Sequence, residues 1–365
     1  MAVERFRVGI AQVNPRLGDV EANLALYAER VAAARAAGAE LVVFPELSLT
    51  GYFLKDMVST VALRLEAAEV ERLKTLSRGI GLVAGFVEEA PDYRFYNSAA
   101  YFEDGELVYV HRKVYLPTYG LFDEGRYLAR GDQLRSFDSK FGRLSLLVCE
   151  DLWHPSTVYV AALDEALLVI CPSSSPLRGI TDGSNQDNNA RYWELINTAY
   201  AQTFSMFVVY ANRVGFEDGV GFWGGSEIVS PLGQRLAKAP YYDEGLIVAD
   251  VNLKDARRQR VMSPLLRDEN LDLTIRELER IRAGRPSGEP QAAKGKPRRV
   301  TALASLPRSK TGPAAARERA PGGAHLKPVP RVIRGRKKRV GAVTPARERG
   351  HLRGLPRTTR PRKKK

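Results

Sequence analysis

Short apolar runs alternate with longer segments rich in Ala, Leu, Glu and Arg over roughly the first 280 residues. The runs are FRVGIAQV, LVVFPE, LVAGFVE, LSLLVCE, LLVICPS and SMFVVYAN. LVVF, LSLLVC and LLVIC are apolar at successive positions, which is typical of strands that are covered on both faces. The alternation of such strands with helical segments predicts a layered α/β domain.

Helices are expected over residues 19–38, 187–205 and 270–284, and the last of these ends at Gly284. The segments EDGE at 103–106 and PLGQ at 231–234 are typical of hairpin turns between strands. A chain that combines hairpins with helix-connected strands is predicted to form mixed sheets rather than a purely doubly wound one.

The positive charge of the chain is concentrated at its C-terminal end. From Ser287 onward there are 24 Lys and Arg against 3 Asp and Glu, whereas the preceding residues carry 32 basic and 39 acidic side chains. From about residue 286 the composition is Pro, Gly, Ala, Arg and Lys, which cannot bury enough apolar surface to fold alone. We therefore expect a folded domain over 1–285 and a disordered tail over 286–365.

The runs RGRKKR at 334–339 and PRKKK at 361–365 are dense enough to attract nucleic acid or another polyanion through counterion release. The alternative is a solvated appendage without a partner.

Several classes of protein are disfavoured by inspection. Cys149 and Cys171 are too few for a disulfide framework, and no charged-then-apolar leader opens the chain, which is typical of a cytoplasmic protein with reduced thiols. No apolar run approaches the roughly 18 to 20 residues of a membrane span. Two of the four histidines lie in the tail, which leaves too few ligands for a metal site of His and Cys side chains. Neither a metal nor a cofactor is therefore expected. GVGFWG at 219–224 matches the dinucleotide-binding string, but we expect it in a loop before a strand, where the fingerprint requires a helix.

Three polar residues each follow an apolar strand: Glu46 after LVVFP, Lys113 after LVYVHR and Cys149 after LSLLV. Sites of α/β sheets assemble at the carboxyl ends of strands. A thiol nucleophile needs a base to take its proton, and a lysine can stabilise the oxyanion that forms on attack. Taken singly, these residues are better explained as a core cysteine, a first-turn helix carboxylate and a solvated surface lysine. Their joint placement favours a thiol-based site, with Cys171 as an inert core residue.

Five segments resemble the nitrilase superfamily of carbon-nitrogen hydrolases over residues 4–283. In order, they are FRVGIAQVNPRLGDVEANL, VVFPELSLTGY, HRKVYLPTYGLFDEGRYL, LLVCEDLWHPS and GGSEIVSPLGQRLA. The FDE after the lysine and the CEDLWHP segment are most similar to the glutaminase domain of glutamine-dependent NAD synthetase. The SGGxDS loop of the synthetase domain is not found in the sequence, so a full NAD synthetase is not expected.

This resemblance implies a four-layer α-β-β-α sandwich that forms a homodimer or a higher homo-oligomer. It also implies a catalytic triad of Glu46, Lys113 and Cys149, with Glu124 in LFDEGRY as a second glutamate. Tyr52 in LTGY matches a position near the family's substrate pocket, although a packing role is equally expected.

Arg178 in SSSPLRG follows the strand LLVIC at the same sheet edge. A guanidinium there could bind a substrate carboxylate through two parallel hydrogen bonds, and a surface ion pair is the alternative.

The expected function is hydrolysis of a small carboxamide, glutamine-like or an ω-amide, to acid and ammonia through a thioester on Cys149. The alternatives are another amidase or carbamoylase of the superfamily, or a polyanion-binding protein directed by its tail. Glu150 and Asp151 follow the nucleophile directly, and we expect structural roles for both.

Overall fold

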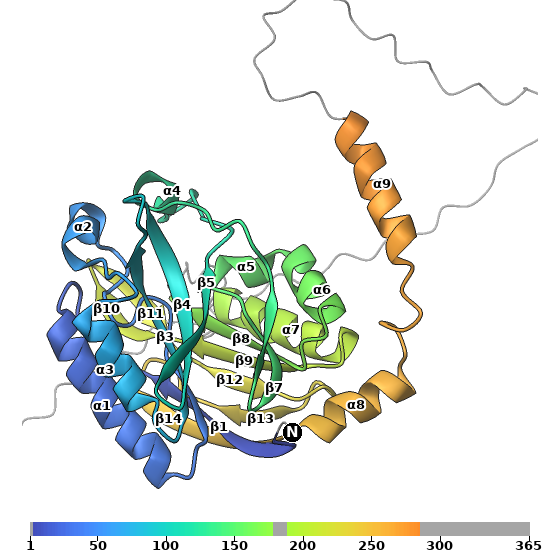
Figure 1. Ribbon diagram of the computed structural model, residues 1–365, viewed down its shortest axis with the longest axis horizontal. Helices are drawn as coiled ribbons and strands as arrows, with labels where there is room; N and C mark the ends of the chain where they lie inside the picture. Colours follow the sequence, from blue (N-terminus) through green and yellow to red (C-terminus); the bar gives the residue numbers. More distant parts are fainter. Residues whose placement is uncertain (1–2, 178–187, 285–365) are drawn as a thin grey trace, which may run out of the picture. The chain divides into compact units, whose positions relative to one another are not determined.

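The computed structural model describes residues 3–177 and 188–284. Within these ranges the chain forms two six-stranded mixed sheets and a separate two-stranded hairpin (Figure 1). Arg178 and the tail expected over 286–365 lie outside the described residues.

The first sheet has the strand order β14-β1-β2-β3-β4-β5. Strands β1, β2 and β3 are mutually parallel, whereas β14, β4 and β5 join by antiparallel pairing. Its strands are β1 (Arg5–Gln12), β2 (Leu41–Val43), β3 (Gly81–Glu89), β4 (Phe95–Glu103), β5 (Glu106–Arg112) and β14 (Gly245–Asn252).

The second sheet has the order β13-β12-β9-β8-β7-β6 and a parallel centre formed by β7, β8 and β9. Its strands are β6 (Ser136–Ser139), β7 (Gly142–Leu146), β8 (Leu168–Ser173), β9 (Phe207–Asn212), β12 (Glu227–Val229) and β13 (Arg235–Lys238). The hairpin pairs β10 (Val214–Glu217) with β11 (Val220–Trp223).

Helices cover the outer face of each sheet. On the first sheet these are α1 (Val20–Ala36) and α3 (Ala68–Leu76), and on the second they include α6 (Pro155–Leu163) and α7 (Asn188–Thr203). The remaining helical segments are η1 (Lys55–Met57), α2 (Val58–Val61), α4 (Glu124–Tyr127), α5 (Glu150–Trp153), α8 (Leu253–Met262) and α9 (Leu271–Gly284).

Apolar side chains fill the spaces between these layers. Val8, Ile10 and Val43 of the first sheet share one buried cluster with Leu144 and Ile170 of the second. Alternate residues of the first sheet, Val42 and Leu82 among them, pack instead with the inward side chains of α1. Both faces of the central strands are therefore covered, which explains their continuous apolar sequence. The α-β-β-α sandwich implied by the resemblance is confirmed.

The local sequence expectations are also largely confirmed. The three expected helices correspond to α1, α7 and α9, and the two expected turns join β4 to β5 and β12 to β13. The placement of GVGFWG in a loop is wrong, because residues 220–223 form β11. The β-branched and aromatic residues of this segment pair across the hairpin with 214–217. No helix in the described part of the chain is both long and apolar enough to cross a membrane.

The topology brings several chain segments to one edge. Because β5 is antiparallel to β4, which is antiparallel to β3, the end of β5 and the start of β4 lie at the carboxyl edge of β2 and β3. Lys113, which follows β5, donates its backbone N–H to the carbonyl oxygen of Asn97 in β4 at 2.8 Å. The ends of β7 and β8 supply the facing segments from the second sheet.

A glycine in β3 lets the segment after β2 approach this edge. A Cβ placed on Gly85 would lie 2.6 Å from the backbone nitrogen of Leu47 and 2.8 Å from the carbonyl oxygen of Pro45. Since both neighbours are backbone atoms, neither can move without displacing the residues around Glu46.

We therefore expect Gly85→Ala to lower the free energy of unfolding by about 1–3 kcal/mol, the usual cost of overpacking a core. Gly245→Ala in β14 is the control, because its Cβ would meet its nearest neighbour, Pro240 Cδ, at 3.6 Å, an ordinary contact. Denaturant unfolding of both variants measures the difference, and equal stability of the two would contradict this account.

Candidate active site

Cys149 lies at a tight turn between β7 and α5. Its backbone φ is +45°, a conformation that costs a residue with a side chain roughly 1–3 kcal/mol. Its N–H donates to the carbonyl oxygen of Pro172 at 2.9 Å, and its own carbonyl accepts from the N–H of Leu152 at 3.0 Å. Strain that the surroundings impose on one cysteine marks this turn as a candidate functional position.

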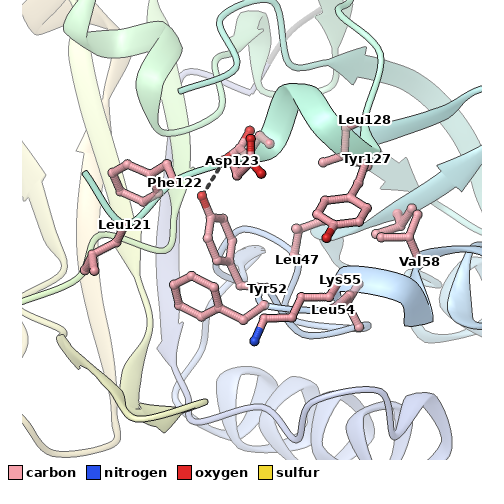
Figure 2. A pocket seen from close by; sticks show the side chains of 13 residues that line it. Leu47, Tyr52, Leu54, Lys55, Val58, Leu121, Phe122, Asp123, Tyr127 and Leu128 are labelled. Atoms are coloured by element: carbon pink, nitrogen blue, oxygen red, sulfur yellow. Dashed lines mark hydrogen bonds between the residues drawn. The ribbon is translucent and has the colours of Figure 1, made fainter. Parts of the chain in front are cut away.

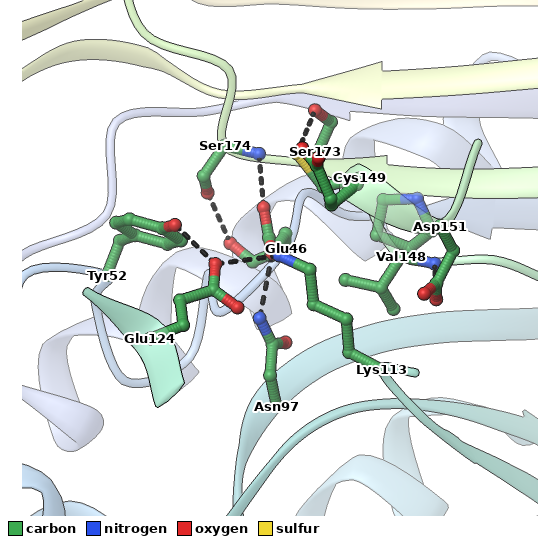
Figure 3. Close-up of polar contacts among 12 residues, drawn as sticks. Glu46, Tyr52, Asn97, Lys113, Glu124, Val148, Cys149, Asp151, Ser173 and Ser174 are labelled. Carbon is green, nitrogen blue, oxygen red and sulfur yellow. Dashed lines mark hydrogen bonds and ion pairs between the residues drawn. The ribbon is translucent and has the colours of Figure 1, made fainter. Parts of the chain in front are cut away.

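Glu46 is buried at the centre of a polar cluster (Figure 3). Its Oε1 accepts from Lys113 Nζ and from Asn97 Nδ2, each at 2.7 Å. Its Oε2 accepts from the backbone N–H of Ser174 at 2.7 Å, and its carbonyl oxygen accepts from Ser174 Oγ at 2.8 Å. The carboxylate is thereby held by residues from both sheets.

Lys113 also contacts a second carboxylate. Its Nζ donates to Glu124 Oε1 at 2.7 Å, and the Tyr52 hydroxyl donates to the same oxygen. Lys113 is fully buried and Glu124 is 7% exposed. The ammonium therefore bridges Glu46 and Glu124 away from bulk water.

The sulfur of Cys149 has a different neighbour. Ser173 Oγ, at the end of β8, donates to Sγ at 3.3 Å. Among the described residues, no hydrogen bond joins Sγ to the Glu46 carboxylate, although the two lie close enough to interact electrostatically. Figure 3 shows Cys149 between the Glu46 cluster and the side chain of Asp151.

Burial and mutual charge shift the pKa values of this cluster. Burial, reinforced by the Glu46 carboxylate, raises the pKa of the Cys149 thiol well above its usual value, although Lys113 opposes the shift. Burial lowers the pKa of Lys113, but the charges of Glu124 and Glu46 outweigh it and raise that pKa well above normal. Burial raises the pKa of Glu124 to about 7, despite the opposing charge of Lys113. The resting site therefore holds a neutral thiol beside a charged ammonium.

A cavity of about 160 Å³ adjoins the cluster at Tyr52 and Glu124 (Figure 2). Its walls are mainly apolar side chains from the loop after β2, from α2, from β3 and from the 121–128 segment. They include Leu47, Phe53, Leu54, Val58, Val87, Leu121, Phe122 and Leu128. Tyr52 and Glu124 of the cluster line this cavity, whereas Cys149 does not.

The structure brings together Glu46, Lys113, Cys149, Glu124 and Tyr52, which the sequence singled out. Arg178, the other residue singled out, lies outside the described residues. In the described part of the chain, no group of three or more His, Cys, Asp or Glu side chains is arranged to hold a metal ion.

Sequence reasoning missed Asn97, Ser173 and Ser174. Asn97 could have been found as a polar residue within the apolar strand FYNSAAYF. The two serines follow the apolar run LLVIC, and the strand-end rule that identified Cys149 applies to them equally.

Glu124→Gln is expected to change how stability depends on pH. Because the folded pKa of Glu124 is raised from 4.5 to about 7, the native state keeps a proton that the unfolded chain releases between these values. Wild-type stability is therefore lost as the pH rises through this window, whereas the glutamine cannot ionise. The melting temperature of the variant relative to wild type should rise from pH 5 to pH 8.

Glu106→Gln, at the exposed first position of β5, is the control and should show no such trend. A melting-temperature difference for Glu124→Gln that is flat with pH would rule out a raised pKa at this carboxyl.

Comparisons with known proteins place this geometry in context. The model of the carbon-nitrogen hydrolase family matches residues 7–261. A glutamine-dependent NAD(+) synthetase from Thermotoga maritima is 32% identical over 267 residues, which are 72% of this chain and 45% of that protein. The chain thus spans about half the length of the synthetases that it matches.

Solved structures agree with the sequence matches. A carbon-nitrogen hydrolase from Helicobacter pylori superposes with a TM-score of 0.68 at 27% identity, covering 76% of this chain and 99% of that one. A mutant of the amidase from Nesterenkonia sp. AN1 has a TM-score of 0.62 at 29% identity, covering 74% of this chain and 96% of that one. In that structure the acetamide moiety of fluoroacetamide is covalently added at the active site cysteine. The family model matches well more than half of this chain. The chain therefore belongs to the carbon-nitrogen hydrolases of the nitrilase superfamily.

Proposed function

We propose that this protein is a thiol amidohydrolase that cleaves the C–N bond of a small carboxamide to give a carboxylic acid and ammonia. The observation that carries the proposal is the Lys113 ammonium, which lies 2.7 Å from both Glu46 and Glu124 beside the strained Cys149. Membership of the carbon-nitrogen hydrolase family supports the same reaction class.

In the first step, Cys149 Sγ attacks the amide carbon while Glu46 takes the thiol proton. A base is needed because burial keeps the thiol protonated by raising its pKa. The hydrogen bond from Sγ to Glu46 is expected to form when the amide enters, since catalytic hydrogen bonds commonly tighten only in the substrate complex.

The attack places negative charge on the former amide oxygen. Lys113 Nζ has three N–H bonds, of which two point to carboxylates, so one is left for this oxyanion. Glu150 is the first residue of α5, and its backbone N–H therefore has no acceptor within the helix. We assign these two donors to stabilisation of the oxyanion.

Collapse of the intermediate breaks the C–N bond as Glu46 returns the proton to the leaving nitrogen. Ammonia departs and leaves an acyl group on Cys149 as a thioester. Glu46 then deprotonates a water molecule that Glu124 helps to position, and the water attacks the thioester carbon. The acid leaves, and the sulfur recovers its proton from Glu46.

We propose a glutamine-like amide or an ω-amide as the substrate, because several relatives are glutamine-dependent NAD synthetases. The likeness to the Nesterenkonia amidase supports the alternative of another small amide, and a carbamoyl compound also remains in this class. Tyr52 and Arg178 are the proposed substrate contacts. Any use of the ammonia in a synthetic reaction would require a second active site that accepts it.

We further propose that the enzyme is a cytoplasmic homodimer or higher homo-oligomer, an expectation that rests on its cysteine content and on the family resemblance. Polyanion binding by the basic tail rests on sequence alone, because 286–365 lies outside the described residues.

Ammonia release from a panel of amides, nitriles and carbamoyl compounds tests the reaction. At least one amide should be hydrolysed, and Cys149→Ala should lower kcat by at least about 10³-fold because the nucleophile is removed. Cys171→Ala, which alters the other buried cysteine, should retain kcat within about threefold. Ammonia release that survives in Cys149→Ala would disprove the assignment.

The thioester predicts a trapped species. Acid quenching during turnover, followed by peptide mass spectrometry, should find the substrate acyl group on the peptide that contains Cys149 and not on the one that contains Cys171. Hydroxylamine should intercept the same thioester as a hydroxamate, which reports it even where it does not accumulate. Full-rate turnover with neither acylated Cys149 nor a hydroxamate would indicate direct attack by water instead.

A further inference from the structure

Asp151 is a fully buried carboxylate that the proposed reaction does not use. Its Oδ1 accepts from the backbone N–H groups of Val114 and Tyr115 at 3.0 and 2.9 Å. Its Oδ2 accepts from the backbone N–H of Val148 at 3.0 Å and from Nε2 of His111 at 2.8 Å. Four directional contacts thus converge on one side chain.

The partners of Asp151 flank the two reacting side chains. Val114 and Tyr115 directly follow Lys113, whereas Val148 directly precedes Cys149. Lys113 follows β5 of the first sheet and Cys149 follows β7 of the second, and no strand pairing joins these sheets within the described residues. Asp151 therefore cross-links the two strand ends at the site.

Apolar packing between sheets fixes their separation better than their relative sliding, because dispersion contacts have little directional preference. Hydrogen bonds to backbone N–H groups are directional and add this constraint. A displacement of about 1 Å at a reacting group can lower the rate by about 10²-fold.

We propose that Asp151 is a positioning residue, which holds the Lys113 segment in register with Cys149. The ammonium then meets the oxygen, and the sulfur meets the carbon, of the same amide carbonyl group. This inference rests on the proposed function and deepens it. Asp151 touches neither reacting side chain through a hydrogen bond and acts through the backbone on both sides of the site.

Asp151→Asn is the informative change because it keeps the shape and alters only the hydrogen bonding. An amide has one acceptor oxygen, so its NH₂ group must face either the Val148 N–H or the N–H groups of Val114 and Tyr115. One side of the cross-link is lost in either orientation.

Asp164→Asn is the matched control. Asp164 also joins two segments, accepting from the backbone N–H of Ser136 and from Arg143 Nη2, each at 2.6 Å, but it belongs to neither strand end of the site. Both variants are expected to lower the melting temperature, and only Asp151→Asn should alter the reacting groups.

The experiment measures kcat and KM on the best amide, together with the rate of Cys149 alkylation by iodoacetamide, followed by peptide mass spectrometry. Asp151→Asn should lower kcat about 30- to 100-fold with KM within about threefold, and should slow alkylation about tenfold because the ammonium is no longer held beside the thiol. Asp164→Asn should keep both rates within about twofold. Alkylation displaces iodide and needs no hydrolysis of an amide bond, so it tests the positioning role even if no amide is hydrolysed and the proposed function fails.

A folded Asp151→Asn with kcat and alkylation within twofold of wild type would overturn the proposal. If that variant does not fold, His111→Ala decides, because it removes one of the four donors. Its kcat and alkylation rate should each fall about three- to tenfold, and His111→Gln should restore them by supplying an N–H donor. Unchanged rates in a folded His111→Ala would likewise overturn the proposal.

Discussion

The burial of the Lys113 ammonium between two sheets sets the requirements for the groups around it. Removing such an ion from water costs several kcal/mol even after the protein relaxes. Glu46 and Glu124 offset this cost with two bonds of 2.7 Å. The carboxylates in turn need donors, and Asn97, Tyr52 and the Ser174 backbone supply them. One buried charge thereby accounts for the polar side chains that contact it and for the donors that those side chains need.

The same buried ammonium explains why neighbouring groups of the cluster differ in protonation state. Two carboxylates close to one ammonium leave an excess of negative charge, which burial makes unfavourable. Glu124 responds with a pKa of about 7, and the thiol of Cys149 stays protonated. A nucleophile that is neutral at rest makes a base necessary, and this is the role that we propose for Glu46.

The cluster and the surrounding cavity are built from different parts of the fold. Glu46, Lys113 and Cys149 follow strands of the two sheets, whereas the cavity at Tyr52 is formed largely by the loop after β2 and the 121–128 segment. Loops tolerate change better than strands, so the walls of this cavity can change without altering the cluster. This division fits the presence of both amidases and glutamine-dependent synthetases among the similar proteins.

The layered α/β class, the long helices and the polar residues at the ends of the strands could all be predicted from the amino-acid sequence. Hydrophobic periodicity and short-range turn signals are local properties, so α1 and the β4–β5 turn could be predicted from neighbouring residues alone. The same reasoning failed for GVGFWG, because pairing of β10 with β11 depends on a partner strand that its own composition does not specify.

How these residues contact one another depends on the tertiary structure. The contacts of Lys113 with Glu46 and Glu124 span 67 and 11 positions, and those of Asp151 with His111 span 40. Whether residues so far apart in the sequence come into contact depends on how the two sheets register against each other, which no local pattern encodes. Asp151 is an example. In the sequence it is one more polar residue shortly after Cys149, whereas in the fold it joins the strand ends that precede Lys113 and Cys149.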